Sequence, residues 1–476
     1  MKQSKNRMQV KDLKYCSSNT FGIFKMAMLS FIFICIISCE SFLEIDPPKD
    51  KLVNETLFQD VALVEGALAN IYYKMREQGM VSGTSGLSTS MGVYTDELKY
   101  IGDSDDRLRL ENHTVTALHP TMSDWWSNAY NLIYAANDII KGVENSNNLS
   151  IEEKETFKGQ ALFVRAYLHS LLVGLFGDVP YVSTPNYLEN NVATRTPKNE
   201  VYNNIIRDLN LATPLLEDVS EERVVPNKSA AQALLARMYL YVENWAMAEI
   251  TATSVIDAHV LEPDVSKVFL KESQETLWQF KPGASIRNTL EAIALIIQAV
   301  PTTTGYPLAD NLLVAFEPND LRRANWVGSK SSANGLETLY FAYKYKEPLV
   351  NIRQPILEYS IIFRLAEQYL IRAEARAHLD KIGEAQEDLN AIRNRAGLGN
   401  TTASNTNELL DAILQERQVE LFTEHGQRWF DLKRLGNPAE VLAPIKPGWR
   451  NTDILLPIPE TELLANPNLK PQNDGY

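Results

Sequence analysis

Cysteine, the residue with the most versatile chemistry, is confined to one end of this sequence, at Cys16, Cys35 and Cys39. The rest of the 476-residue chain has none, which excludes a disulfide framework, a thiolate metal site and a cysteine nucleophile there. Cys39 follows basic residues and an apolar run, Met26–Ile37, that suits a signal-peptide core and is too short to span a bilayer. Ser38 directly before Cys39 is typical of a bacterial lipobox, in which the cysteine is acylated and becomes the mature N-terminus. An ordinary secretory signal with an incidental cysteine is the alternative.

Catalytic constellations do not stand out. The sequence has no G-x-S-x-G, H-E-x-x-H, P-loop or G-x-G-x-x-G pattern. His113 and His119 are six positions apart and could in principle bind a metal, and the acidic loop Asp103–Asp106 lacks the glycine and distal glutamate of an EF-hand. Any acidic chain supplies carboxylate pairs for glycoside hydrolysis, and no pair is distinguished. We therefore predict no catalytic residue, no metal and no cofactor.

Aromatic and polar residues gather instead in two irregular segments, residues 79–119 and 261–350, rich in Gly, Pro, Ser, Thr and Asp. A sugar site needs flat aromatic faces for the ring and planar amide, carboxylate or guanidinium groups for the hydroxyls. Trp326 follows Arg322 and Arg323 in a polar context, which predicts exposure. Packing in a local core is the alternative for each aromatic residue. The candidate ligand-binding residues are Asp96, Tyr100, Arg109, Tyr306, Trp326 and Tyr340.

Most of the remaining chain has the spacing of amphipathic helices. Ala236 and Ala248 are twelve positions apart, and so are Ala373 and Ala385, each pair within a helix–turn–helix of about 34 residues. Small residues at this spacing predict close contact between paired helices and a solenoid-like frame. The helices expected are 61–78, 125–142, 152–176, 198–216, 229–243, 246–259, 361–379, 382–396 and 407–426. Short strands are expected at 275–280 and 339–345.

Charge excludes one class of partner. The chain carries 46 basic and 60 acidic residues, a net charge of −14. Loss of residues 1–38, with six basic residues and one acidic residue, leaves 40 basic and 59 acidic residues, so −19. A surface this acidic repels phosphate backbones, and we predict no nucleic-acid partner.

Motifs along the whole chain after Cys39 resemble those of the SusD/RagB family of nutrient-binding outer-membrane lipoproteins of Bacteroidetes. Each motif is short, but their order and coverage are specific. They are FLEIDPP (42–48), WSNAYNLIYAAND (126–138), RAY (165–167), LFGDVP (175–180), RAEA (372–375), LNAIRNRAGL (389–398), RWFDLKR (428–434) and LPIPE (456–460).

This resemblance implies a mainly α protein, with a tetratricopeptide-like superhelical frame and a loop-rich ligand-binding part containing a few short strands. The expected divisions are a lipoprotein signal peptide (1–38), an acidic tether (39–60) and one domain (61–476). The frame of that domain would cover 120–260 and 355–435. In the family pattern an acidic residue near Asp96, and basic or aromatic residues after it, face the ligand.

The resemblance also implies a function. The protein would be a non-enzymatic, lipid-anchored, surface-exposed outer-membrane protein that captures oligosaccharides and delivers them to a SusC-like TonB-dependent transporter. A peptide-binding member of the same family is the alternative, and a surface glycan hydrolase is a further one. The charges of Arg417, Glu420, Glu424 and Arg428, three or four positions apart, are expected to pair along one helix as a buried network that braces the frame.

Overall fold

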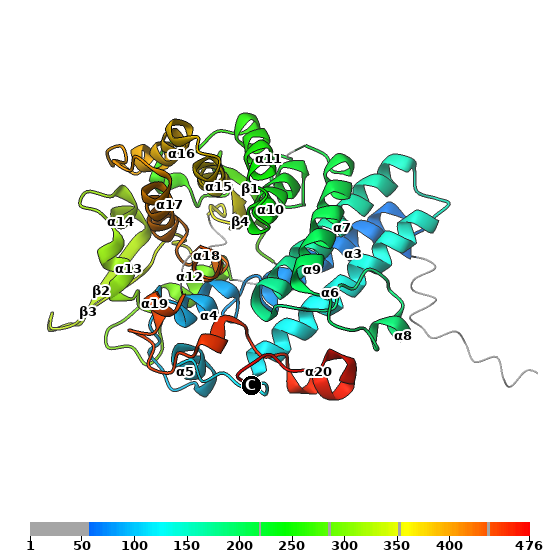
Figure 1. Ribbon diagram of the computed structural model, residues 1–476, viewed down its shortest axis with the longest axis horizontal. Coiled ribbons are helices and arrows are strands. Elements are labelled where there is room, and N and C mark those ends of the chain that lie inside the picture. The colour runs from blue at the N-terminus through cyan, green and yellow to red at the C-terminus, as the bar shows by residue number, and fades with distance from the viewer. Residues whose placement is uncertain (1–56, 219, 284–286, 351–353, 436–437) are drawn as a thin grey trace, which may run out of the picture. The chain divides into compact units, whose positions relative to one another are not determined.

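The computed structural model describes residues 57–476 except 219, 284–286, 351–353 and 436–437 (Figure 1). The predicted lipidation site, Cys39, lies outside the described residues, as do the signal peptide and most of the tether. The first described helix, α3 (Val61–Glu77), begins after Asp60, whose carboxylate accepts a hydrogen bond from the Ala62 amide at 2.7 Å. This N-cap was expected from the sequence and is confirmed.

The frame is a succession of helices in which each packs against the next (Figure 1). This arrangement confirms the predicted fold class, a mainly helical tetratricopeptide-like frame with small sheets. The frame helices are α6 (Pro120–Asn145), α7 (Ile151–Phe176), α9 (Lys198–Ala212), α10 (Lys228–Tyr241), α11 (Trp245–Ala258), α15 (Leu365–His378), α16 (Ile382–Arg395) and α17 (Thr406–Leu421).

The two alanine pairs lie where the paired helices meet. Ala236 on α10 and Ala248 on α11 are fully buried, and so are Ala373 on α15 and Ala385 on α16. Because α10 packs on α11 and α15 on α16, the predicted helical hairpins are confirmed. A side chain without atoms beyond Cβ lets such backbones approach closely, so these positions serve packing.

Helix α7 is the central helix of the frame. Its start is fixed by a capping box, in which Ser150 and Glu153 satisfy each other's backbone amides, and its end by Gly177 at φ 78°. Among the described residues it is the one helix long and apolar enough to cross a bilayer, and its apolar window is wholly buried inside the protein. Its composition therefore reflects a position in the core of the frame.

One predicted helix is wrong at its start. Residues 361–364 were expected to begin a helix, but they belong to strand β4 (Ser360–Arg364), which pairs antiparallel with β1 (Thr276–Phe280). Every residue of both strands is buried. The backbone hydrogen bonds of residues 360–364 are made with a strand some 80 positions away along the chain, and helix α15 starts only at Leu365.

The expected helix 407–426 is also wrong at its end, because the observed helix stops five residues earlier. Helix α17 ends at Leu421, and α18 (Gln427–Arg434) begins after Gly426, which has φ 74°. This left-handed conformation suits glycine and turns the chain between the two helices. The side chains of the two helices therefore face different neighbours, which changes the expected pattern of ion pairs.

The two irregular segments contain short elements. The first holds α4 (Leu87–Tyr94) and α5 (Asp105–Glu111); the second holds η2 (Val265–Lys267), β1, α12 (Leu290–Leu295), α13 (Asp310–Ala315), α14 (Leu321–Trp326), β2 (Val327–Ser331) and β3 (Thr338–Ala342). Strands β2 and β3 form an antiparallel hairpin. The remaining elements are α8 (Tyr187–Asn190), η1 (Thr213–Leu215), α19 (Pro438–Leu442), η3 (Asn451–Ile454), α20 (Glu460–Ala465) and η4 (Pro467–Leu469).

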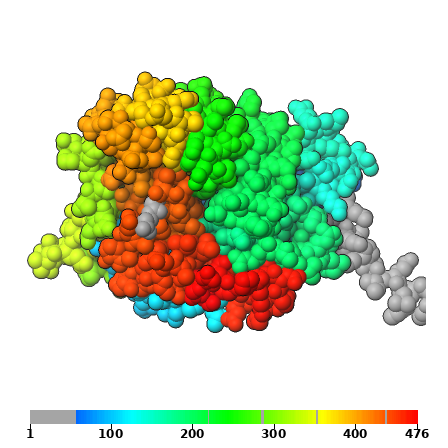
Figure 2. Space-filling model, viewed as in Figure 1, coloured from blue at the N-terminus to red at the C-terminus, as the bar shows by residue number. Residues whose placement is uncertain are grey.

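The C-terminal segment, red in Figure 2, lies against the green part of the frame. The side-chain amides of Asn466 and Asn468 donate hydrogen bonds to the carbonyl oxygens of Ala193 and Val192, at 2.8 and 2.9 Å. These contacts hold α20 and η4 beside the loop that follows α8.

Candidate functional site

Backbone pairing joins the two irregular segments, which are about 200 residues apart in sequence. Antiparallel bridges link Leu98 to Leu308 and Ile101 to Gly305. Ile101 and Gly305 exchange two hydrogen bonds of 2.9 Å, and the Leu308 amide donates to the carbonyl of Tyr340 at 2.7 Å. We call this region, residues 98–101 and 305–308 with Tyr340, the loop junction.

Two of the predicted residues, Tyr100 and Tyr306, face each other in the loop junction. They are opposite each other in the register, next to the hydrogen-bonded pair of Ile101 and Gly305, where side chains come closest. Their ring centroids are 5.5 Å apart with an interplanar angle of 37°. Tyr306 is 8% exposed and backs the partly exposed Tyr100. The sequence predicted both residues, and the structure brings them together.

Tyr340 is on β3 and is also partly exposed. The guanidinium carbon of Arg323 is 4.8 Å from the centre of its ring, a cation–π contact on one face. Because the Tyr340 carbonyl accepts the Leu308 amide, the β2–β3 hairpin is fixed to the loop junction.

Helix α5 carries two arginines, Arg107 and Arg109. Arg107 donates to the hydroxyls of Ser90 and Ser85, each at 2.8 Å, so its position is held by the residues around α4. Burial raises the pKa of Tyr306, and the positive charge of Arg107 opposes that rise. Arg109, a predicted ligand residue, is partly exposed and pairs with Asp105 on the same helix at 2.6 Å.

Arg107 lies in the first irregular segment, between the candidates Tyr100 and Arg109, and Arg323 lies three residues before Trp326. A signal for α5 was present, because Ser104, Asp105 and Asp106 have the side chains favoured at the start of a helix. This helix places Arg107 toward Tyr306.

Asp96 does not reach the surface. It is 2% exposed, and the Arg428 guanidinium donates to both of its oxygens, from Nε at 2.8 Å and from Nη2 at 2.7 Å. Gln418 donates a third hydrogen bond at 3.2 Å. With its oxygens occupied inside the protein, Asp96 serves the frame, and its expected orientation toward a ligand is wrong.

Trp326 is likewise buried, at 1% exposure, so its expected exposure is wrong. Its indole Nε1 donates to the Val265 carbonyl at 2.9 Å. The neighbouring Arg322, which suggested a polar surface, is itself buried and pairs with Glu416 at 2.6 Å and Asp320 at 2.8 Å. The polar neighbours of Trp326 thus belong to a buried ionic network.

That network is centred on Glu420, which pairs with arginines from three other elements, Arg322, Arg364 and Arg395. Burial alone would raise the pKa of Glu420, but the guanidinium groups of these three arginines hold it well below its usual range. The predicted buried network is therefore present, although the expected pairing along one helix is wrong. Arg417 pairs with Asp431, Glu424 with Lys344 and Arg364, and Arg428 with Asp96.

The two histidines that could in principle bind a metal, His113 and His119, are engaged separately. His113 Nε2 lies 2.8 Å from the Tyr94 carbonyl oxygen, and His119 Nε2 lies 3.0 Å from that of Asp106. Within the described residues, no group of three or more His, Cys, Asp or Glu side chains is arranged to hold a metal ion.

The loop junction thus offers tyrosine rings next to guanidinium groups. Such rings can stack on the C–H face of a sugar, and guanidinium N–H groups can donate to its hydroxyl oxygens.

Comparisons with known proteins agree with this architecture. Residues 41–240 match a SusD-like family described as "Starch-binding associating with outer membrane", and residues 302–476 match the SusD family. SusD-like protein P2 of Formosa agariphila is 28% identical, over 94% of this chain and 98% of its own.

Solved structures show the same fold. A SusD superfamily protein from Bacteroides vulgatus superposes with a TM-score of 0.78 at 19% identity, covering 88% of this chain and 99% of that chain. A laminarin-binding SusD-like protein superposes with a TM-score of 0.72 at 23% identity, covering 87% of this chain and 99% of that chain. With matches in both halves of the sequence and along the whole fold, this chain belongs to the SusD/RagB family.

Proposed function

We propose that this protein captures neutral oligosaccharides at the cell surface and delivers them to a SusC-like TonB-dependent transporter in the outer membrane. The observation that carries the proposal is the pairing of Tyr100 with Tyr306, at 5.5 Å between ring centroids, where the two irregular segments join. Tyr100 packs against the buried Tyr306 and is itself partly exposed, so the exposed part of its ring would stack on a sugar. Tyr340, Arg109 and Arg107 would provide further contacts around it.

The comparisons support the ligand class. One matched family carries starch binding in its description, and one structural neighbour is described as binding laminarin. Both are neutral glucans. The loop junction combines tyrosine faces with guanidinium donors, the pair of features that a neutral sugar requires.

Attachment to the membrane would come from acylation of Cys39. Each buried CH₂ of an acyl chain contributes about 0.8 kcal/mol, so several chains hold a protein firmly on a bilayer. The acidic tether that follows would place the folded part above the surface, next to the transporter.

Calorimetry on the protein lacking residues 1–39 tests the binding site, with malto-oligosaccharides and laminari-oligosaccharides as probes. One lost stacking contact of about 1 kcal/mol corresponds to roughly fivefold weaker binding, which we expect for Tyr100→Ala. Tyr73→Ala is the matched control, because Tyr73 is 51% exposed on α3, outside the loop junction.

Equal affinity of wild type and Tyr100→Ala would reject the loop junction as the site. Tight binding of peptides, with no binding to any glycan, would reject the ligand class. Release of new reducing ends from the probes would identify a hydrolase.

Delivery is tested in cells. We expect the protein to co-purify with a TonB-dependent barrel from detergent-solubilised outer membranes. Deletion of the barrel should abolish oligosaccharide uptake while leaving surface binding intact. Uptake that does not depend on any such barrel would reject this part of the proposal.

A further inference from the structure

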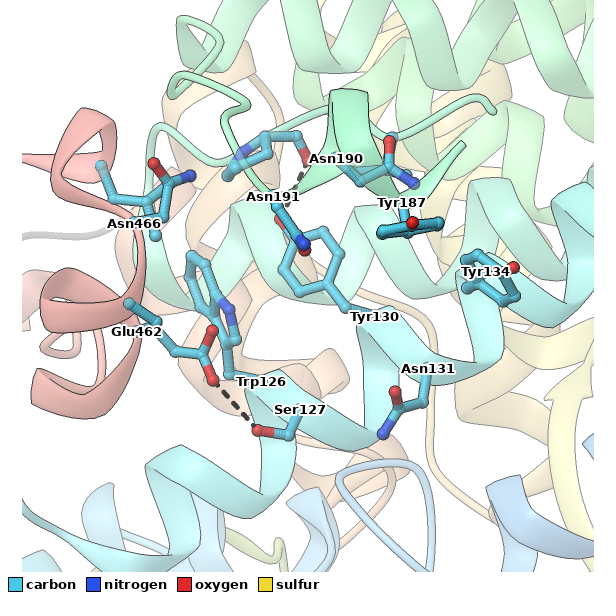
Figure 3. Close-up of a pocket in the computed structure, with 14 residues that line it drawn as sticks. Trp126, Ser127, Tyr130, Asn131, Tyr134, Tyr187, Asn190, Asn191, Glu462 and Asn466 are labelled. Carbon is cyan, nitrogen blue, oxygen red and sulfur yellow. Dashed lines mark hydrogen bonds between the residues drawn. The ribbon is translucent and has the colours of Figure 1, made fainter. Parts of the chain in front are cut away.

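A second feature with the composition of a ligand site lies outside the loop junction. It is a pocket of about 510 Å³ between α6, the region around α8, and the C-terminal elements α20 and η4 (Figure 3). This volume falls in the range of about 300–1,000 Å³ that small-molecule sites occupy. We call it the α6 pocket.

Aromatic residues form one wall of the α6 pocket. Trp126, Tyr130 and Tyr134 are four positions apart on α6, so they lie on one face of that helix. Trp126 is 2% exposed, Tyr130 is partly exposed and Tyr134 is 41% exposed, so the stripe runs from a buried floor to an open mouth. Tyr187 of α8, 61% exposed, faces the mouth from the other side (Figure 3). Two accessible tyrosine rings at one opening are suited to stacking on a flat partner.

The walls of the α6 pocket are held in place by hydrogen bonds to the backbone. The Tyr130 hydroxyl donates to the Pro180 carbonyl at 2.9 Å, and the Asn190 amide donates to the Thr184 carbonyl at 2.8 Å. Asn466 is held by its bond to Ala193, so the C-terminal wall is fixed as well. A pocket formed before the ligand arrives avoids the entropic cost of ordering loops upon binding.

Polar groups in the α6 pocket suit hydroxyl groups. Asn131 and Asn191 are exposed side-chain amides, each of which can donate and accept hydrogen bonds. The Glu462 carboxylate accepts from the Ser127 hydroxyl at 3.3 Å through one oxygen and retains capacity at the other. Figure 3 shows Glu462 and Ser127 at the Trp126 end of the pocket.

The charge of the α6 pocket limits the ligand class. Among the described residues that line it, Glu462 is the one that carries a formal charge at neutral pH. Burial raises the pKa of Tyr130 well above its usual value, with Glu462 contributing, so its phenol stays protonated. A single negative charge repels uronic or sulfated sugars and accepts hydrogen bonds from the hydroxyls of a neutral one.

We propose that the α6 pocket is a second carbohydrate-binding site, specific for neutral oligosaccharides and independent of the loop junction. Tyr134 and Tyr187 would stack on a sugar ring at the mouth, and Asn131, Asn191 and Glu462 would bind its hydroxyls. The choice of ligand class rests on the proposed function, whereas the position of the site rests on the pocket alone. Two sites on one chain would retain a polysaccharide by increasing the effective concentration of its unbound part.

The test is calorimetry with maltohexaose and laminarihexaose on four proteins lacking residues 1–39. These are the wild type, the pocket variant Tyr134→Ala/Tyr187→Ala, the junction variant Tyr100→Ala/Tyr340→Ala, and the control Tyr73→Ala. Tyr134 and Tyr187 are exposed, whereas Tyr100 and Tyr340 are partly exposed and pack against the core. Thermal melting therefore checks that each double variant is folded. We expect two bound oligosaccharides per wild-type or control chain, and one per chain for either double variant.

The outcomes separate the two sites. One bound oligosaccharide per wild-type chain, kept in the pocket variant and lost in the junction variant, would overturn the α6 pocket and leave the proposed function standing. If oligosaccharide binding is lost in the pocket variant and kept in the junction variant, the result would support the α6 pocket and overturn the loop junction. No binding of either probe to the wild type would overturn both. Tighter binding of a polygalacturonate oligomer than of either neutral probe, lost in the pocket variant, would overturn the specificity for neutral sugars.

Discussion

Arg428 holds Asp96 by two parallel hydrogen bonds, from Nε to Oδ1 at 2.8 Å and from Nη2 to Oδ2 at 2.7 Å. The pair connects α18, which follows the frame helix α17, to the segment directly after α4, from which the loop junction begins. Burial would lower the pKa of Arg428, but Asp96, through its hydrogen bonds and its charge, raises it above its usual value. The chain that carries Tyr100 is therefore attached to the frame four residues before the ring itself.

We expect Asp96→Asn to destabilise the protein by about 3–5 kcal/mol, because it leaves the Arg428 charge buried without a counterion. Urea unfolding measures the loss. The control is Asp105→Asn, whose carboxylate is 74% exposed in its pair with Arg109 and should contribute at most about 1 kcal/mol. An Asp96→Asn protein with wild-type stability and lost glycan binding would restore Asp96 to the ligand site.

Trp326→Ala should cost about 3–5 kcal/mol of stability, since it leaves a cavity under a buried ionic network. Lys344 Nζ lies 5.0 Å from the centre of the indole ring, and the guanidinium carbon of Arg364 lies 5.9 Å from it. Trp326→Phe keeps a ring beneath these cations and should cost less. Denaturant midpoints of the two variants provide the measurement. A native midpoint for Trp326→Ala would contradict the buried position.

Local sequence signals were sufficient to predict the ends of a helix where neighbouring residues cap it. Helix α7 begins one residue before its predicted start and ends at the predicted Phe176, because Ser150, Glu153 and Gly177 determine its ends locally. The strand β4 could not be predicted in the same way. Its residues pair with β1, and a partner so distant in sequence gives no periodic signal near residue 361.

In the candidate site too, features set by local sequence were predicted, and features set by distant partners were not. The sequence indicated that Tyr100 and Tyr306 lie in binding segments. Their contact, however, depends on the pairing register of two segments of the chain, in which the two tyrosines are 206 positions apart. Asp96 and Trp326 were misassigned because a polar context resembles a surface whether its charges are solvated or paired inside. The partners of the buried charges are distant in sequence: Arg428 is 332 positions from Asp96, and Glu416 is 94 positions from Arg322, the arginine near Trp326. The α6 pocket gives no local signal, because its lining combines a motif typical of a packed helix, residues 126–138, with residues from two distant parts of the chain.

Ala248→Trp should destabilise the frame by about 1–3 kcal/mol or more, because a fully buried position between α10 and α11 cannot accept an indole. Ala246→Trp is the matched control on the same helix, at an exposed position. Thermal melting compares the two. Equal melting temperatures would mean that α10 and α11 are not packed closely at Ala248.

Cys39→Ala should abolish acylation, because the variant lacks the thiol that would receive the lipid. We expect palmitate to label the wild-type protein in cells and not the variant, and the variant to be recovered in the soluble fraction or as the unprocessed precursor. Ser38→Gly, which keeps a small residue before the cysteine, is the control and should be labelled. Labelling of Cys39→Ala equal to that of the wild type would contradict the lipobox.

Glu97, the neighbour of Asp96, is buried with a carboxyl group that should be protonated at neutral pH. Burial raises its pKa to about 8, and the negative charge of Asp96 adds to this rise, while Arg428 and Lys344 oppose it. Glu97 Oε1 accepts a hydrogen bond from the Thr423 amide at 3.3 Å. The carboxyl group therefore behaves in the fold as a neutral acceptor.

This raised pKa sets the sign of a pH dependence. The unfolded chain releases the Glu97 proton near pH 4.5, whereas the folded protein retains it until about pH 8. Within that window the folded state binds more protons, so the contribution of Glu97 to stability falls as pH rises, by at most about 1.4 kcal/mol per pH unit, and levels off above the folded pKa. Glu97→Gln keeps the shape and the acceptor but cannot ionise. Urea unfolding of both proteins from about pH 5 to about pH 8 isolates the effect, because the other titrating groups are common to the two. We expect the stability of Glu97→Gln relative to wild type to increase steadily across this range. A difference that does not change with pH would mean that Glu97 is already ionised in the folded protein.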